Sequence, residues 1–86
     1  MAVLKVSVVS ADQELWSGEA SQLIARTTEG EIGILPGHEP LLAILAKGQV
    51  RVTATDGAEI TANADNGFLS VENNTVTVVA SSAELV

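Results

Sequence analysis

Apolar and polar residues alternate along much of this chain, with the period of two that is typical of a β-strand with one face in water. The clearest case is residues 50–55, where Val50, Val52 and Ala54 alternate with polar or charged residues. The alternation resumes over residues 60–64, after an Asp56-Gly57 pair. Because Asp-Gly is a preferred hairpin turn, these two runs predict an antiparallel hairpin.

The same criterion predicts strands along the rest of the chain, separated by Gly, Asn, Asp and Ser. The predicted strands cover residues 3–9, 14–18, 21–27, 32–35, 41–46, 50–55, 60–64, 68–72 and 75–80, with turns at 10–13, 65–67 and 73–74. No segment is a helix long enough to connect parallel strands. The pattern therefore predicts an all-β fold, a flattened antiparallel sandwich or barrel of many short strands. We expect one domain over residues 1–86, with 81–86 as a short polar tail.

The composition limits what the core can contain. The chain has 86 residues, of which 47% are hydrophobic, yet Trp16 and Phe68 are the only aromatic ones. We expect a core of Val, Ile, Leu and Ala that includes Trp16, although tryptophan is also a common exposed anchor in interfaces. Five large aliphatic residues lie between positions 35 and 45, more than one short strand can bury on one face. Part of this set is therefore expected at a partner surface.

The charge balance excludes some partners. Eleven acidic and four scattered basic residues give a net charge of −7, which disfavours nucleic acids and anionic lipid surfaces. The absence of cysteine fits a reducing compartment. No apolar run approaches the roughly 20 residues that cross a bilayer, and residues 1–10 alternate instead of forming a signal sequence. We expect a soluble protein without a removable secretion signal.

The most unusual stretch runs from Glu29 to Leu42. It contains two acidic residues close to its start, three glycines, two prolines and the only histidine, His38. Proline fixes its own φ and glycine opens conformations closed to other residues, so the stretch predicts a tight acidic turn, a short strand and a rigid loop. A rigid loop that presents particular side chains is suited to recognition.

Signals for catalysis or for a bound metal are weak. His38 near Glu29, Glu31 and Glu39 is the only candidate metal cluster, but a single histidine without a paired ligand spacing favours a solvated or interface role. No Gly-x-Ser-x-Gly elbow is present, and no Lys or Ser/Thr follows the last glycine as in a phosphate loop. We expect no catalysis, no cofactor, no metal and no small-molecule substrate, and keep a hydrolase using His38 only as a formal alternative.

The stretch from Glu29 to Leu42 resembles a segment of the epsilon subunit of the rotary proton-translocating ATP synthase, in its N-terminal β-sandwich domain. The resemblance extends to Trp16-Ser17-Gly18, Gly67-Phe68-Leu69 and the run from Val76 to Ala80. The two helices that usually follow this domain in the family have no counterpart here, so their regulatory role and nucleotide site are not carried over. A carbohydrate- or peptide-binding module with a similar sandwich remains the alternative.

The resemblance implies a non-catalytic subunit of the central stalk, which binds the gamma subunit and the c-ring and couples proton-driven rotation to ATP synthesis. It also implies a peripheral location on the cytoplasmic face of the bacterial cell membrane, held there by partners and not by direct insertion. The residues it assigns to the c-ring contact are Glu29, Gly30, Glu31 and Ile32, and those it assigns to the gamma contact are Ser10, His38 and Ala43.

Overall fold

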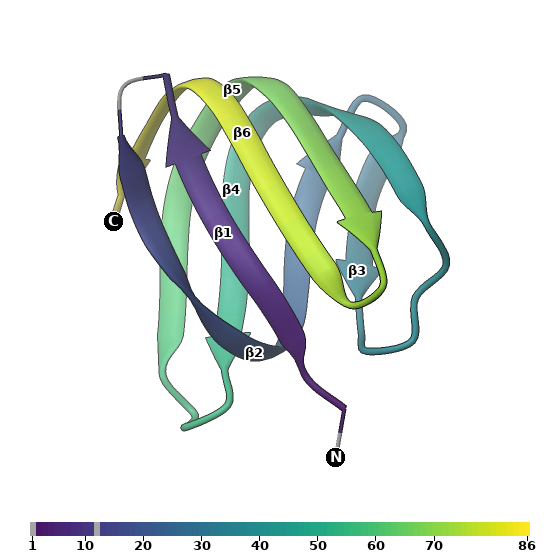
Figure 1. Ribbon diagram of the computed structural model, residues 1–86. Coiled ribbons are helices and arrows are strands. Elements are labelled where there is room, and N and C mark those ends of the chain that lie inside the picture. Colours follow the sequence, from purple (N-terminus) through teal and green to yellow (C-terminus); the bar gives the residue numbers. More distant parts are fainter. Residues whose placement is uncertain (1, 12) are drawn as a thin grey trace.

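The computed structural model, which describes residues 2–11 and 13–86, is a single sheet of six strands that curls into a flattened sandwich (Figure 1). The strands are β1 (Leu4–Ser10), β2 (Glu14–Thr27), β3 (Gly30–Ile34), β4 (Leu41–Ala54), β5 (Glu59–Glu72) and β6 (Thr75–Leu85). Their order is β1-β6-β5-β4-β2-β3, and β1 also pairs with β2, so the sheet closes on itself. The all-β prediction is confirmed.

One pair of strands departs from the predicted antiparallel arrangement. β1 and β6 run parallel, with Lys5 opposite Thr75 and Ser10 opposite Ala80. The other five pairs are antiparallel. β1 and β6 lie at opposite ends of the chain and no hairpin joins them, so nothing in their connection requires antiparallel pairing.

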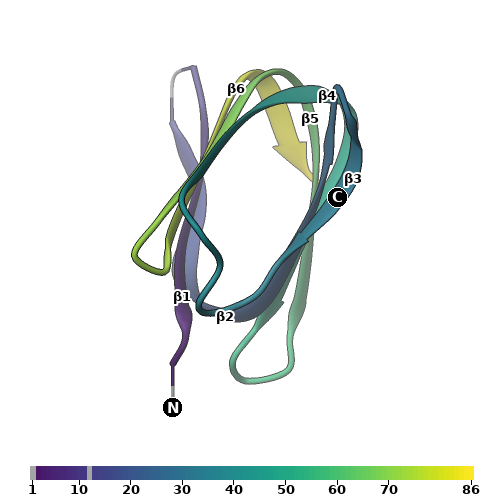
Figure 2. The same ribbon diagram turned by 90° about the vertical axis from the view of Figure 1, so that its right-hand side faces the viewer.

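The strands are fewer and longer than predicted, because β2, β4 and β5 each run for 14 residues. Each of these strands curves through both layers of the sandwich (Figure 2). Gly18 lies inside β2 and does not end a strand, and residues 81–85 continue β6 instead of forming a polar tail. Asp12, which the sequence places in the first turn, lies outside the described residues.

The segment Asp65-Asn66-Gly67 is a bend inside β5 and not the predicted turn. Asn66 adopts a positive φ of 56°, yet the pairing with β6 continues across it, with Asp65 opposite Ser82 and Gly67 opposite Ala80. Phe68 follows this segment directly and pairs with Val79.

The core is aliphatic, as the composition predicts. Its buried hydrophobic residues are Leu4, Val6, Val8, Ala20, Leu23, Ala25, Ile34, Leu45, Val50, Val52, Ala62, Ala64, Leu69, Val71, Val76, Val78 and Ala80. Trp16 is half-buried and packs against this cluster, so it contributes to the core without being enclosed by it. No helix among the described residues is long and apolar enough to cross a membrane.

Candidate functional site

The acidic turn between β2 and β3 is held in place by a buried threonine. Thr27 is 5% exposed, and its Oγ1 donates a hydrogen bond to the Gly30 carbonyl at 2.7 Å. The same oxygen accepts a hydrogen bond from the Glu29 N–H at 3.2 Å. Gly30 adopts a φ of 117°, which glycine allows at no steric cost. The turn therefore presents the exposed carboxylates of Glu29 and Glu31 from a well-defined backbone.

The four residues assigned to the c-ring contact differ in exposure. Glu31 is exposed and lies 3.8 Å from Arg51, with 62% and 46% of the two side chains accessible. A pair this open contributes only about 0–1 kcal/mol, so the Glu31 carboxylate remains available to a partner. Ile32 is half-buried, lies opposite Ala25 and packs against the core. We call residues Glu29 to Ile32 the acidic hairpin. A partner would meet mainly its carboxylates and backbone, because the side chain of Ile32 is half-buried.

The loop after β3 contains a tight turn at its Pro-Gly pair and is hydrogen-bonded to a distant part of the chain. Its Pro36-Gly37 turn is closed by a hydrogen bond from the His38 N–H to the Leu35 carbonyl at 3.1 Å, and Gly37 has the positive φ of 90° that a type II turn requires. The Gly37 N–H also donates to the Asn74 Oδ1 at 2.7 Å. This bond ties the loop to the turn between β5 and β6, 37 residues further along the chain.

His38 is half-buried, and its Nδ1 lies 2.7 Å from the Glu39 carbonyl oxygen. Over residues 2–11 and 13–86, no group of three His, Asp or Glu side chains converges in a way that would hold a metal ion. The geometry around His38 is that of a side chain fixed by its own loop.

An apolar row, exposed on β4 and β5 and half-buried on β6 and β1, crosses the outer face of four neighbouring strands. Ile44 lies opposite Phe68, Phe68 opposite Val79, and Val79 opposite Val9, on β4, β5, β6 and β1 in turn. Ile44 and Phe68 are 57% and 39% exposed, and Leu42, two residues before Ile44 on the same face, is 70% exposed. We call Leu42, Ile44, Phe68, Val79 and Val9 the apolar row.

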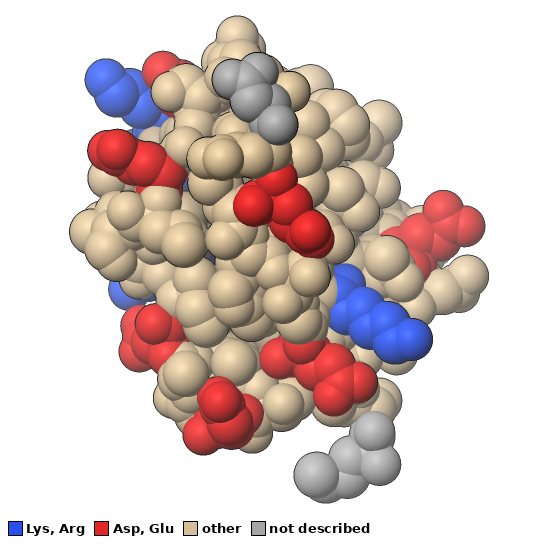
Figure 3. Space-filling model, turned by 60° about the vertical axis from the view of Figure 1, so that its left-hand side comes forward, with Lys and Arg blue, Asp and Glu red and all other residues tan. Residues whose placement is uncertain are grey.

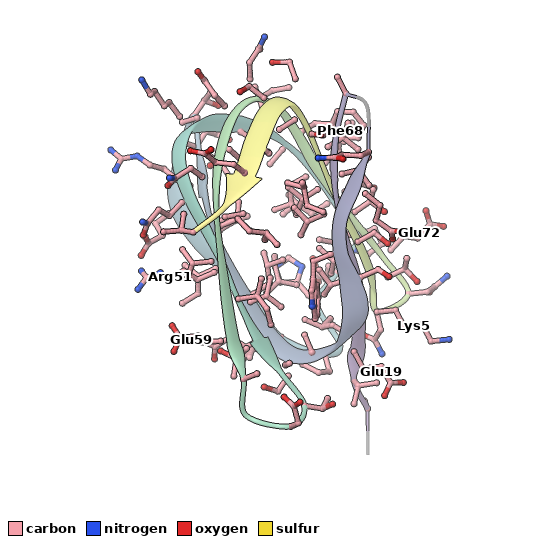
Figure 4. The ribbon with its side chains drawn as sticks, turned by 90° about the vertical axis from the view of Figure 1, so that its left-hand side faces the viewer. Lys5, Glu19, Arg51, Glu59, Phe68 and Glu72 are labelled. Carbon is pink, nitrogen blue, oxygen red and sulfur yellow. The ribbon has the colours of Figure 1, made fainter. Side chains whose placement is uncertain are left out.

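The outer face becomes more polar with distance from the apolar row. Next to it on β5, β6, β1 and β2, the hydroxyl side chains of Ser70, Thr77, Ser7 and Ser17 lie in register, with Leu42 opposite Ser70 on β4. A third row carries Glu72, Thr75, Lys5 and Glu19. Phe68, Glu72, Lys5 and Glu19 project from the same side of the sandwich in Figure 4. Along β5, β6 and β1, the side chains on this face therefore change from apolar, through hydroxyl-bearing, to mostly charged.

Acidic side chains prevail over basic ones on the face that Figure 3 shows, where several carboxylates are spread among uncharged residues. A shallow groove of about 620 Å³ on the outer side of β4, β5 and β6 has mixed charges, since Lys47, Asp65 and Glu84 all line it. Such a groove lacks the apolar walls typical of a small-molecule site.

The residues that the sequence assigns to the gamma contact lie around the outer face that carries the apolar row. Ser10 follows Val9 at the end of β1, and Ala43 lies between Leu42 and Ile44. Because successive side chains of a strand point to opposite faces, Ala43 turns inward and lies opposite the buried Leu69. His38 lies in the loop that is tied to the β5–β6 turn at the charged end of this face.

Three members of the apolar row, Val9, Phe68 and Val79, were missed from the sequence as candidate contact residues. A signal for them exists, because each strand in the row carries two consecutive apolar residues. The doublets are Val8-Val9, Ile44-Leu45, Phe68-Leu69 and Val78-Val79. One residue of each doublet enters the core and the other must face outward. Part of the aliphatic set over positions 35 to 45 is exposed, since Leu35 is 57% exposed whereas Leu45 is 3% exposed.

Comparisons with known proteins agree on one family. Residues 3–86 match the family described as "ATP synthase, Delta/Epsilon chain, beta-sandwich domain". The chain is 53% identical to the ATP synthase epsilon chain of Micrococcus luteus, over 99% of this chain and 93% of that protein. It is 46% identical to the epsilon chain of Streptomyces coelicolor, over 98% of this chain and 68% of that protein.

Solved structures show the same fold. A chain in a cryo-EM structure of the Euglena gracilis mitochondrial ATP synthase, described as OSCP/F1/c-ring, superposes with a TM-score of 0.91 at 26% identity. The match covers 99% of this chain and 54% of that one, so this chain spans about half of its length. A chain of the Tetrahymena thermophila ATP synthase central stalk and c-ring superposes with a TM-score of 0.78 at 17% identity, which shows the fold alone.

Proposed function

Because the chain belongs to the delta/epsilon β-sandwich family of ATP synthase subunits, we propose that it is a non-catalytic subunit of the central stalk. In this role it binds the gamma subunit and the c-ring and couples proton-driven rotation to ATP synthesis. The observation that carries the proposal is the match to epsilon chains over nearly the whole length of this chain. The match favours this function over an unrelated carbohydrate- or peptide-binding module.

The acidic hairpin is proposed as the c-ring contact, through Glu29, Gly30, Glu31 and Ile32. The two glutamates are exposed, and Thr27 holds the backbone between them. Their charge suits a partner loop that carries a basic side chain. Exposed ion pairs contribute about 0–1 kcal/mol each and weaken with salt. This contact therefore orients the two subunits and adds little to the free energy of binding.

The gamma subunit is proposed to contact Ser10, His38 and Ala43. The support is their position, since they lie around one outer face and the loop of His38 is hydrogen-bonded to the β5–β6 turn. A rigid loop loses little conformational entropy on binding, which favours affinity.

The proposed location is the cytoplasmic face of a bacterial membrane, where the subunit is peripheral and held by its partners. The net charge of −7 opposes direct adsorption to anionic lipid. Binding to membranes should therefore require the assembled c-ring and gamma subunit.

The test measures binding of the chain to purified gamma subunit and to c-ring in detergent, with Glu31→Lys as the variant and Glu59→Lys as the matched control. Both residues are exposed glutamates, and Glu59 lies at the start of β5, outside the acidic hairpin. We expect Glu31→Lys to weaken c-ring binding and to leave gamma binding unchanged, while Glu59→Lys changes neither. Failure of the unmodified chain to bind either partner would overturn the proposal.

A further inference from the structure

We propose that Arg51 competes with the c-ring for the carboxylate of Glu31 and thereby limits the strength of the c-ring contact. The inference rests on the proposed function, because it requires the acidic hairpin to meet a basic loop of the c-ring. It assigns a role in that contact to a residue on β4, outside the hairpin and two strands away from it.

Arg51 reaches Glu31 across an intervening strand. Arg51 lies on β4 opposite Ile24 of β2, and Ile24 lies opposite Gly33 of β3. Directly opposite residues share a face of the sheet, and so do residues two apart on one strand, so Glu31 and Arg51 project from the same face. Their strands are separated by two spacings of about 4.8 Å. Only two long side chains span this separation, and here the Arg51 Nη2 comes within 3.8 Å of the Glu31 Oε2.

A second arginine is closer to Glu31 in the sheet but packs elsewhere. Arg26 lies directly opposite Glu31, on β2. Its side chain packs over Gly48 of β4, since a Cβ at Gly48 would lie 2.9 Å from the Arg26 Cδ and 3.3 Å from the Arg26 Cβ. The lack of a side chain at Gly48 makes room for this packing. Within the described part of the chain, Glu31 therefore forms its ion pair with Arg51.

The geometry of this pair allows a partner to displace Arg51. A charge-assisted hydrogen bond from nitrogen to a carboxylate oxygen is about 2.7–2.9 Å long. The contact of 3.8 Å is therefore an attraction between charges without a hydrogen bond, and 62% of the Glu31 side chain is accessible. A basic side chain of the c-ring that forms a hydrogen bond to Glu31 approaches the carboxylate more closely than Arg51 does. Its binding either separates Arg51 from Glu31 or leaves two cations beside one carboxylate, and both arrangements lower the affinity.

Arg51 lies on the side of the molecule opposite to the outer face around which the gamma contact is proposed. Figure 4 shows Arg51 on one side of the sandwich, whereas Lys5 and Glu72 project from the other. A replacement of Arg51 therefore changes the surroundings of the acidic hairpin and leaves the gamma contact untouched. Because it also makes the net charge of −7 more negative by one unit, its control must remove one positive charge as well.

The test measures the affinity of Arg51→Gln for purified c-ring in detergent, with Lys47→Gln as the matched control. Lys47 is an exposed cation on the same strand, so its replacement removes the same charge and leaves the pair in place. Exposed ion pairs change an equilibrium by a factor of up to about five. At about 50 mM salt we therefore expect Arg51→Gln to bind the c-ring about two- to fivefold more tightly than the unmodified chain, and the control to stay within about 1.5-fold of it.

Two further measurements distinguish competition from a structural role of Arg51 and from direct repulsion of the c-ring. The gain in affinity should disappear at about 1 M salt, where the Debye length is about 3 Å. It should also fall below about 1.5-fold when Arg51→Gln is made in a Glu31→Gln background, because the contested carboxylate is then absent. Circular dichroism checks the fold of each variant, and binding to purified gamma subunit should not change.

The outcomes separate this inference from the proposed function. If folded Arg51→Gln binds the c-ring more weakly or equally well, Arg51 does not compete for Glu31 and the inference is wrong. If the gain persists in the Glu31→Gln background, Arg51 repels the c-ring directly, which also overturns the inference. In these cases the unmodified chain still binds the c-ring, so the stalk function stands. If the unmodified chain binds neither c-ring nor gamma, the proposed function itself fails.

Discussion

Replacement of Gly67 tests the bend in β5 most directly, because the neighbouring strand leaves no room for a side chain there. A Cβ at this position would overlap the Val79 carbonyl oxygen and lie 2.6 Å from the Ala80 Cα. Both are backbone atoms of β6, so no rotation of a side chain relieves the overlap. Gly67→Ala must therefore push β5 and β6 apart where Gly67 pairs with Ala80.

The expected cost of Gly67→Ala is a large part of the stability of the chain. Overpacking alone costs about 1–3 kcal/mol and sometimes more. Loss of one or two ladder hydrogen bonds adds about 1 kcal/mol each, so we expect about 2–5 kcal/mol in total. At roughly 0.05–0.15 kcal/mol per residue, a chain of this length has only about 4–13 kcal/mol of stability. The melting temperature should fall by more than about 8 °C.

Thermal and urea unfolding followed by circular dichroism measures the effect, with Gly33→Ala as the control. A Cβ at Gly33 meets no atom within 4 Å, so this variant should stay within about 0.5 kcal/mol of the unmodified chain. If Gly67→Ala melted within about 2 °C of the unmodified chain, the close approach of β5 and β6 at the bend would be refuted.

Three further changes test the two turns. Thr27→Val should cost about 1–3 kcal/mol, because the Gly30 carbonyl loses its donor in a buried site; an unchanged urea midpoint would contradict this. Asn74→Ala should cost about 1–2 kcal/mol, since it removes the acceptor for the Gly37 N–H and places alanine at a φ of 62°; calorimetry that shows no loss would argue against the link between the turns. Glu31→Gln should change the free energy of unfolding by less than about 1 kcal/mol at any salt concentration, because its ion pair is exposed; a larger, salt-dependent loss would show a stronger pair.

The hairpins at Asp56-Gly57 and at Asn73-Asn74 were predictable from the sequence, because each depends on two adjacent turn residues. Asp56-Gly57 joins β4 to β5, with Gly57 at a φ of 91° and its N–H donating to the Ala54 carbonyl at 2.9 Å. Asn73 and Asn74 join β5 to β6 with positive φ angles of 49° and 62°. These turns need only the conformations that Gly and Asn allow. Asp65-Asn66-Gly67 has the same composition but only bends β5, because β6 pairs with both sides of it.

The candidate site was predictable in part. The sequence identified the acidic hairpin and the rigid proline loop, because both depend on Gly and Pro within a few residues. The apolar row could not be predicted from the sequence. Ile44 and Val9 are 35 positions apart in the chain, and they belong to one row only because β5 and β6 pair between their strands. The contacts that the sequence predicts at Ser10 and Ala43 are next in the chain to Val9, Leu42 and Ile44 of the row.

The sequence by itself determined the strand period, the aliphatic core and the turns at residues 56–57 and 73–74, because each follows from interactions between residues close together in the chain. Only the tertiary structure decided that β1 pairs parallel with β6, that residues 81–85 form a strand, and which residue of each apolar doublet faces outward. These outcomes depend on which strands become neighbours. The period of two says that one residue of a doublet is buried, but only the closed sheet selects Leu69 for the core and leaves Phe68 on the surface.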